Sequence, residues 1–364
     1  MPPATNRIAL ARHLAETLAY AAAGGLTFGL LGVPAGFLSG SILAVAAAAL
    51  AGRPMTMPSP LVRVLLVLIG ISLGAVVTPA TLNGIAAYPL SIAVLIAAMA
   101  CIAVTGAQYL RLMHGCDTVT AYLAAAPGGL TQVMGLAAEL NADMRAIAIV
   151  QTTRVVVIAV GLPAGLSLLG LVGHASRGVG GVFDPSLVGE LAILVVVSTA
   201  AAIAAFRIGF PGGLMFGAML TSAVLHGSGT IHVVMPWWVV NTVMIAFGAV
   251  TGSRFANTPL RMLANYIGAA FGSFAVAVAV TALFAAGLLG FLALPIGEVM
   301  IAYAPGAVDA MMLLALALNL DPVYVGAHHL VRIFLVSFAM PVLAHRHMRR
   351  LKAPDATDKP PSQD

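Results

Sequence analysis

Long apolar runs, separated by short stretches that are polar or rich in Gly and Pro, cover most of the 364 residues. A helix needs about 20 mainly apolar residues to cross a membrane, and twelve runs approach that length. They predict helices near residues 15–33, 34–52, 61–78, 84–110, 118–140, 144–170, 187–206, 211–226, 235–252, 261–291, 296–318 and 322–344. The runs are continuous rather than alternating, which favours helices over a barrel of strands. We therefore expect an all-α polytopic membrane protein with about 10–12 transmembrane helices.

The composition agrees with a membrane location. Hydrophobic residues make up 61% of the chain and charged residues only 8%, whereas a soluble domain has about 25% charged residues. This excludes a soluble enzyme or a free DNA-binding protein as the class of the whole chain. The expected partner is therefore the lipid bilayer, and we expect no nucleic-acid partner.

The net charge of +5 comes from basic residues that lie mostly in loops and at the two ends of the chain. If all twelve runs cross, both termini lie on one side, together with most of these residues. That side carries Arg7, Arg12, Arg53, Arg63, Arg111, Arg177, Arg346, Arg349, Arg350 and Lys352, and the other carries Arg145, Arg207, Arg254 and Arg261. Cytoplasmic loops carry an excess of Lys and Arg. We expect a multi-pass protein of the inner (plasma) membrane with both termini in the cytoplasm.

The two halves of the sequence repeat each other. The paired segments are Gly32-x-Pro34-x-Gly36-x-x-x-Gly40 with Gly209-x-Pro211-x-Gly213-x-x-x-Gly217, Gly70-x-x-x-Gly74 with Gly248-x-x-x-Gly252, and residues 124–143 with 302–321. The last two pairs share an offset of 178 residues, which predicts a duplicated unit. We expect a first membrane repeat over 1–172, a linker over 173–186, a second repeat over 187–344 and a disordered polar cytoplasmic tail over 345–364. The GxxxG faces favour close helix packing within the chain, and a homodimer interface is the alternative.

Each repeat carries a Pro-Gly motif in the middle of an apolar run, Pro127-Gly128-Gly129 in the first and Pro305-Gly306 in the second. Pro removes a backbone donor and Gly lowers helix propensity, so both runs are expected to break. Only protein or a water-filled cavity can satisfy the polar backbone groups of a break at membrane depth. Matched breaks in two repeats indicate a transporter binding site, and a packing kink is the alternative.

The half-helix that follows each break points its N-terminal N–H groups into the break, where an anion is favoured. Thr131 and Gln132 lie in the first turn after the first break, and Asp309 takes the position of Thr131 after the second. A carboxylate inside a membrane is costly and is a functional candidate. The alternative role of Asp309 is to complement the N-terminus of its own helix.

The last apolar run of each repeat contains one arginine in its interior, Arg154 in the first repeat and Arg332 in the second. One role for each arginine is to stabilise, by its charge, an anion or the carboxylate at the break. The alternative is a structural bond to the carbonyl groups of a loop. Gln151 and His329 occupy equivalent positions three residues earlier. His328 and His329 are neighbours and form a pair. Such a pair can relay protons or make structural hydrogen bonds, and we favour the structural role. The residues of both breaks and these side chains together form the predicted substrate- or ion-binding site.

The motifs resemble those of the AbrB family of duplicated integral membrane proteins over about residues 15–345. The resemblance rests on the paired G-x-P-x-G-x-x-x-G segments, A-A-P-G-G-L-T-Q-V-M (125–134), E-L-N-A-D (139–143) with Q-x-x-R (151–154), and A-P-G-A-V-D (304–309) with N-L-D-P (319–322) and H-H-L-V-R (328–332). Members are often labelled regulators of gene expression or ammonia monooxygenases. The breaks also resemble the cation/proton antiporter and anion transporter superfamily, in which two broken helices cross and the repeats are inverted. Six crossing runs per repeat predict parallel repeats instead.

The leading functional hypothesis is a secondary transporter of a small anionic or polar solute, with proton or cation coupling left open, and not an enzyme. The sequence lacks the paired aspartates of typical sodium/proton antiporters, which weakens a pure cation exchanger. A second hypothesis is a membrane-embedded regulator that acts indirectly on gene expression. A membrane monooxygenase is remote, because the nine His residues are scattered and a metal site needs ligands in a defined geometry. We expect no cofactor and no metal.

Overall fold

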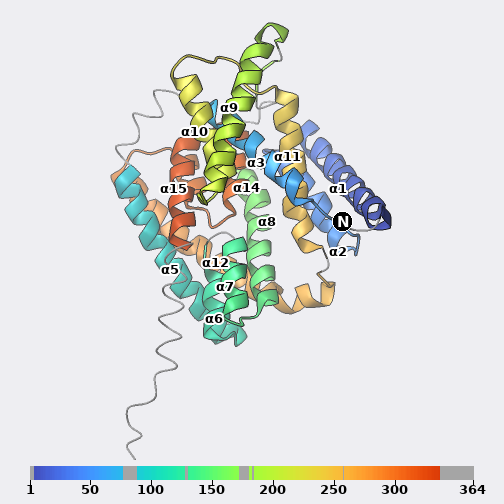
Figure 1. Ribbon diagram of the computed structural model, residues 1–364. Coiled ribbons are helices and arrows are strands. Elements are labelled where there is room, and N and C mark those ends of the chain that lie inside the picture. Colours follow the sequence, from blue (N-terminus) through green and yellow to red (C-terminus); the bar gives the residue numbers. More distant parts are fainter. Residues whose placement is uncertain are drawn as a thin grey trace, which may run out of the picture.

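The computed structural model describes residues 4–76, 88–127, 130–171, 180–182, 184–256 and 258–336, and it is built from helices (Figure 1). The first half contains α1 (Ala4–Leu30), α2 (Gly36–Leu50), α3 (Ser59–Gly74), α5 (Tyr88–His114), α6 (Thr118–Ala125), α7 (Leu130–Glu139) and α8 (Met144–Leu168). The second contains η2 (Pro185–Leu187), α9 (Val188–Arg207), α10 (Gly213–Gly227), α11 (Trp237–Gly252), η3 (Ser253–Phe255), α12 (Leu260–Phe291), α13 (Ile296–Tyr303), α14 (Val308–Ala317) and α15 (Pro322–Phe334). The predicted tail lies outside the described residues.

The helices have the lengths and surfaces of a membrane protein. Within the described ranges, α5, α8, α9 with η2, and α12 are long and apolar enough to cross a membrane. Large apolar side chains such as Val196, Leu283 and Phe291 are exposed on α9 and α12. A soluble protein rarely exposes extended apolar surface of this kind, whereas lipid covers it at little cost. The predicted all-α polytopic membrane fold is thereby confirmed.

The Pro-Gly segments form two helical hairpins, α6–α7 and α13–α14. The backbone N–H of Asp143, which follows α7, donates to Thr120 Oγ1 near the start of α6 at 2.9 Å. At the equivalent place, the N–H of Asp321 donates to Glu298 Oε1 near the start of α13 at 3.4 Å. Each hairpin therefore returns to the end at which it began. The prediction that 118–140 and 296–318 cross as single spans is corrected, because the tertiary contact, not hydropathy, sets the direction of the second arm.

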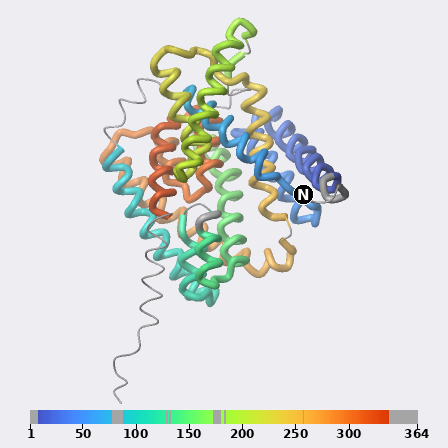
Figure 2. The backbone as a smooth tube through the Cα atoms, viewed as in Figure 1, coloured from blue at the N-terminus to red at the C-terminus, as the bar shows by residue number. Residues whose placement is uncertain are grey.

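Five described helices besides the hairpin remain in each repeat, an odd number, and the repeats are inverted. Tyr88 at the start of α5 donates to Asp321 Oδ2 at 3.3 Å, and its equivalent Tyr266 in α12 donates to Asp143 Oδ2 at 3.0 Å. Equivalent helices of the two repeats thus run in opposite directions and exchange contacts. Figures 1 and 2 show α6 and α7 at the lower end and α14 higher in the bundle. The parallel arrangement predicted from six crossings is corrected.

Short helices exchange contacts in the same way. The backbone of Gly70 in α3 lies against the carbonyl of Met215 in α10, and Gly248 in α11 lies against Ser41 in α2. A side chain at either glycine meets backbone or side-chain atoms of the neighbour, so glycine is what permits the close approach. These GxxxG faces therefore pack helices against each other within one chain.

The hairpins also change the predicted distribution of charge. Arg111 lies in the last turn of α5 and Arg145 in the first turn of α8, and the hairpin between these helices returns to its starting end. Both arginines therefore lie at one end, whereas the count of twelve spans put them on opposite sides. Arg53 pairs with Glu16 of α1 at 3.0 Å at this end. We name it the basic end.

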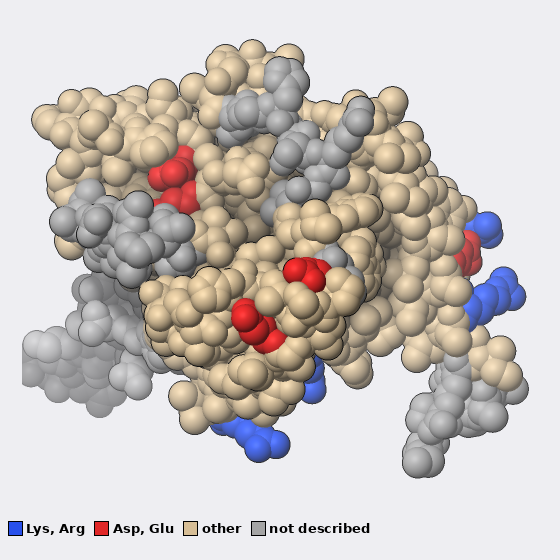
Figure 3. Space-filling view, turned by 90° about the horizontal axis from the view of Figure 1, so that it is seen from above, with Lys and Arg blue, Asp and Glu red and all other residues tan. Residues whose placement is uncertain are grey.

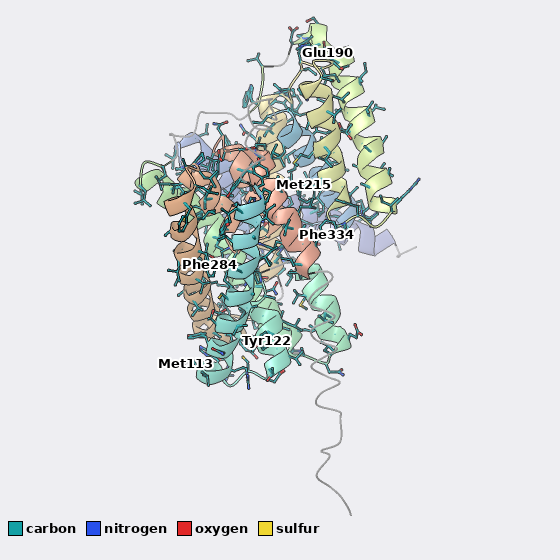
Figure 4. The ribbon with its side chains drawn as sticks, turned by 90° about the vertical axis from the view of Figure 1, so that its left-hand side faces the viewer. Met113, Tyr122, Glu190, Met215, Phe284 and Phe334 are labelled. Carbon is teal, nitrogen blue, oxygen red and sulfur yellow. The ribbon has the colours of Figure 1, made fainter. Side chains whose placement is uncertain are left out.

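The opposite end of the bundle carries acidic groups. Seen from above in Figure 3, this face shows acidic side chains, and basic side chains are visible only towards its edges. Figure 4 places Glu190 at the upper end and Met113 at the lower one. We name the upper one the acidic end, and the start of α15 with Asp321 belongs to it.

Candidate functional site

Both predicted helix breaks are present, at equivalent positions. The helix α6 ends at Ala125 and α7 begins at Leu130, while α13 ends at Tyr303 and α14 begins at Val308. Pro127, Pro305 and Gly306 are buried at the breaks. In the second break the Gly306 N–H donates to the carbonyl of Ala304 at 2.8 Å. The first arm of each hairpin thus ends with carbonyl groups that no helix satisfies.

Arg154 of α8 supports the first break. Its side chain is buried, with 3% exposure, and its two terminal nitrogens donate to the carbonyl oxygens of Ala125 and Ala126 at 3.1 and 3.0 Å. These carbonyls form the C-terminal end of α6, where a positive charge is favoured. Arg154 therefore binds the backbone of the break directly.

Arg332 of α15 supports the second break in the same way. It donates to the carbonyl oxygens of Ala304 at 2.6 Å and Ala302 at 3.1 Å, and it is 1% exposed. Ala304 is the equivalent of Ala126, so the contact follows the repeat. The Nε atoms of Arg154 and Arg332 are buried without a hydrogen-bond partner. The two guanidinium groups lie within electrostatic reach of each other. The breaks therefore meet in the interior of the bundle.

Gln151 and His329 bind the same first arms one turn further back. Gln151 Nε2 donates to the carbonyl of Leu123 at 2.8 Å, and His329 Nε2 contacts the carbonyl of Ile301 at 3.2 Å. Leu123 and Ile301 are equivalent residues. The Nδ1 of His329 is buried and has no hydrogen-bond partner. These two predicted site residues therefore join the arginines in holding the breaks.

The remaining predicted residues of the first break are only partly visible. Gly128 and Gly129 lie outside the described residues. Thr131 and Gln132 lie in the first turn of α7, and their side chains lie outside the description.

Asp309 lies in the first turn of α14, where a carboxylate complements the positive end of the helix. It also interacts electrostatically with Arg254 of η3. Both side chains are only partly exposed. The sequence interpretation placed Arg254 in a loop on one side of the membrane. Its position beside the second break was missed because η3 and α14 are distant in sequence.

A second set of polar side chains, the polar cluster, was not predicted as a unit. It consists of Ser91 from α5, Tyr303 from α13, and Tyr324 and His328 from α15, all with at most 2% exposure. Ser91 Oγ lies 2.6 Å from Tyr324 Oη, 2.8 Å from His328 Nε2 and 3.3 Å from Tyr303 Oη. Comparison of the repeats position by position would have revealed it. The equivalent residues in the other repeat are the apolar Ala269, Ala125, Ala146 and Val150.

Asp143 and Asp321 cap the helices that follow the hairpins. Asp143 Oδ1 accepts from the N–H of Arg145 at 2.9 Å, and Asp321 Oδ1 accepts from the N–H of Val323 at 2.7 Å. Both carboxylates therefore act as N-caps of these helices. Among the described residues, no group of three or more His, Cys, Asp or Glu has an arrangement that could hold a metal ion.

Comparison with known proteins identifies one family and two relatives. Residues 37–347 match the protein family described as "Transition state regulatory protein AbrB". The chain belongs to the AbrB family. It is similar to "Uncharacterized protein YhjN" of Bacillus subtilis (strain 168), with 25% identity over 91% of this chain and 93% of the relative. It is also similar to "Putative regulator AbrB" of Escherichia coli (strain K12), with 24% identity over 88% of this chain and 92% of the relative.

Proposed function

We propose that this AbrB-family protein is a secondary transporter of a small anionic solute, bound where the two broken hairpins meet. The observation that carries the proposal is the pair of inverted hairpins whose breaks are held by the buried Arg154 and Arg332. Irregular backbone at membrane depth is tolerated where it lines a binding cavity, and inverted repeats with broken helices are typical of secondary transporters. The protein acts in this proposal as a carrier and not as an enzyme.

The charges around the breaks favour an anion. Among the described residues, the guanidinium groups of Arg154, Arg332 and Arg254 surround the breaks, and Asp309 is the carboxylate beside them. The N-terminal ends of α7 and α14 add partial positive charge. The C-terminal ends of α6 and α13 are already neutralised by the arginines that bind them. The balance of charge at the meeting point is positive.

Asp309 and Arg254 give the site its asymmetry. The equivalents of Asp309 and Arg254 in the first repeat are Thr131 and Val76, which carry no charge. An anion can bind to Arg254 and to the N–H groups of α14 when it competes with Asp309 for these partners. Binding and release then change the contacts between η3 and the second hairpin. In this proposal, alternating access moves the hairpins against the closely packed α2, α3, α10 and α11.

The distribution of charge supports an orientation with the basic end in the cytoplasm. Arg53, Arg111 and Arg145 lie at that end, and basic residues are enriched on the cytoplasmic side of membranes. The middle of α1 lies beside Arg53, because Glu16 pairs with it, and the N-terminal half of the helix begins from this level. The proposed location is the inner (plasma) membrane, with the N-terminus in the cytoplasm and the acidic end outside.

Uptake by the purified full-length protein in proteoliposomes tests this function. The panel is chloride, sulfate, phosphate, acetate and succinate, with the neutral solute glycerol and the cation ammonium for comparison. Wild type should move at least one anion, and Arg254→Gln and Asp309→Asn should change its apparent affinity or rate. Arg53→Gln, which removes a charge from an exposed ion pair, is the matched control and should behave as wild type. Equal rates for wild type and protein-free vesicles with every solute would refute the proposal.

The names of the family and of the Escherichia coli relative favour a second candidate, a membrane-embedded regulator that affects gene expression indirectly. One experiment distinguishes the two functions. A reporter response in cells that survives Arg254→Gln and Asp309→Asn, while these variants lose anion uptake, would favour a regulatory role separate from transport.

A further inference from the structure

We propose that the polar cluster is a proton pathway that couples transport to proton entry from the acidic end of the bundle. This inference rests on the proposed transport function and adds a coupling ion, a route and a direction to it. The cluster joins α5, α13 and α15 between the acidic end and the second break. It is separate from the arginine contacts that hold the breaks.

The hydrogen bonds of the cluster have one direction. His328 Nδ1 lies 2.7 Å from the carbonyl oxygen of Tyr324, and since a carbonyl only accepts, Nδ1 carries the proton. The other ring nitrogen, Nε2, is then an acceptor and receives the Ser91 hydroxyl proton at 2.8 Å. Ser91 in turn accepts from the Tyr324 hydroxyl at 2.6 Å. Tyr324, Ser91 and His328 thus form a continuous chain of donors that ends on the Nε2 lone pair of the imidazole, which accepts the Ser91 hydrogen bond.

The outer end of the chain approaches two partly exposed carboxylates. The hydroxyl of Tyr88 donates to Asp321, whose N–H donates to Glu298. Glu298 interacts electrostatically with Tyr324. A water molecule is needed to carry a proton from the Glu298 carboxyl to the Tyr324 hydroxyl. Both acids lie at the acidic end, which is the outer face in the proposed orientation.

The inner end of the chain reaches the second break. The titratable and charged groups that face His328 are Tyr88 from α5, Tyr303 from α13, and Tyr324, His329 and Arg332 from α15. The positive charge of Arg332 opposes a proton on His328, because like charges repel. An anion bound beside Arg332 offsets this repulsion. A proton and an anion therefore favour each other in the same conformation, which is the requirement for their transport in one direction.

Proton transfer along the chain leaves no other group changed. One proton enters at Tyr324 Oη from the water beside Glu298. The original Tyr324 hydroxyl proton moves to Ser91 Oγ, and the original Ser91 proton moves to His328 Nε2. The product is one imidazolium, with Tyr324 and Ser91 again neutral hydroxyl groups. After the hairpins have moved, the imidazolium gives one proton to water on the cytoplasmic side, which restores the neutral ring.

The fold itself does not require polar side chains at these positions. At the equivalent positions of the opposite repeat the chain has the apolar residues Ala269, Ala125, Ala146 and Val150. Hydroxyl and imidazole groups cost free energy when they are buried, unless every polar atom is hydrogen-bonded. Ser91 comes from the first repeat and the other three members from the second. Their meeting along a line from the acidic end to a break is what a one-sided proton route needs and what packing alone does not explain.

The test separates proton movement from solute movement in proteoliposomes that contain a trapped pH-sensitive dye. Exchange of labelled anion, from the panel above, measures binding and alternation without net proton transfer. Internal acidification during net anion uptake measures proton coupling. Tyr324→Phe, Ser91→Ala and His328→Gln should keep anion exchange and slow the acidification by about tenfold or more, as expected when a proton-transfer group is lost. Ser91→Thr keeps the hydroxyl and should keep the acidification.

Two matched controls carry the same changes away from the cluster. Ser72→Ala and His226→Gln alter a serine and a histidine that bond backbone carbonyls elsewhere, and both should keep acidification. Acidification at the wild-type rate in Ser91→Ala and His328→Gln would overturn the proton pathway and leave the transport function standing. A wild-type protein that exchanges no anion of the panel would instead refute the proposed function, and the pathway with it.

Discussion

Replacement of Arg332 by Ala tests whether one buried guanidinium group holds the second helix break together. Two terminal nitrogens of Arg332 bind the carbonyls of Ala304 at 2.6 Å and Ala302 at 3.1 Å. A hydrogen bond to a charged group contributes about 1.5–3 kcal/mol, and a buried carbonyl left without a partner costs about 1–3 kcal/mol. Removal of a buried charge returns part of this, because its desolvation is itself costly. We expect a net loss of about 2–5 kcal/mol in the free energy of unfolding.

The assay combines global and local stability of the protein in lipid nanodiscs. Thermal unfolding should shift to lower temperature in Arg332→Ala, and amide hydrogen exchange should accelerate at residues 302–310. Arg332→Lys keeps the charge but not the planar pair of donors, so it should lie between wild type and Arg332→Ala. Arg53→Ala removes an arginine from an exposed ion pair with Glu16 and should change little. Wild-type stability and wild-type exchange in Arg332→Ala would refute the reasoning.

Three further predictions concern the packing, the caps and the orientation. Gly70→Val and Gly248→Val should reduce the yield of folded protein on size-exclusion chromatography, because a Cβ at either position meets the neighbouring helix, whereas Gly161→Ala faces open space and should be tolerated. Asp143→Ala should lower stability by about 1 kcal/mol through loss of the N-cap, as measured by thermal unfolding. With Cys101 and Cys116 replaced, single cysteines at Arg12 and Asp184 should react with an impermeant thiol reagent from opposite sides of the membrane. Labelling of both from one side would contradict the topology.

The fold class, most helix positions and both breaks were predictable from the sequence, although α1 begins at Ala4 and not near residue 15. Hydropathy reports local free energy of transfer, so it located α5, α8 and α12 to within a few residues. The breaks at Pro127 and Pro305 were equally local, because Pro and Gly act on the backbone where they stand. The caps formed by Asp143 and Asp321 are short-range chemistry as well, because each carboxylate accepts from an N–H group two residues ahead.

The direction of the chain after each break was not predictable in this way. A run such as 118–140 has the length and polarity of a crossing helix, whether its second half continues or turns back. The contact between Thr120 and the N–H of Asp143 decides that it turns back. Every later assignment of side then changes, which is why the sequence interpretation put Arg145 on the wrong side relative to Arg111.

The predicted site shows the same division. Arg154 and Arg332 were identified from the sequence by their place inside apolar runs and by their equivalence. Two roles stayed open for them, because the carbonyls that they bind became known only with the fold. Arg254 was missed because its relation to Asp309 joins helices distant in sequence. The polar cluster was missed because Ser91 lies more than 200 residues from the other members.

The sequence by itself determined that this chain is a duplicated helical membrane protein with a broken helix in each repeat. Apolar runs, helix breakers and caps act within a few residues, and so they are readable along the chain. Only the tertiary structure decided that the breaks form returning hairpins, that the repeats are inverted, and which polar groups meet. Those outcomes depend on contacts between segments that are distant in sequence, whose free energies no local pattern contains.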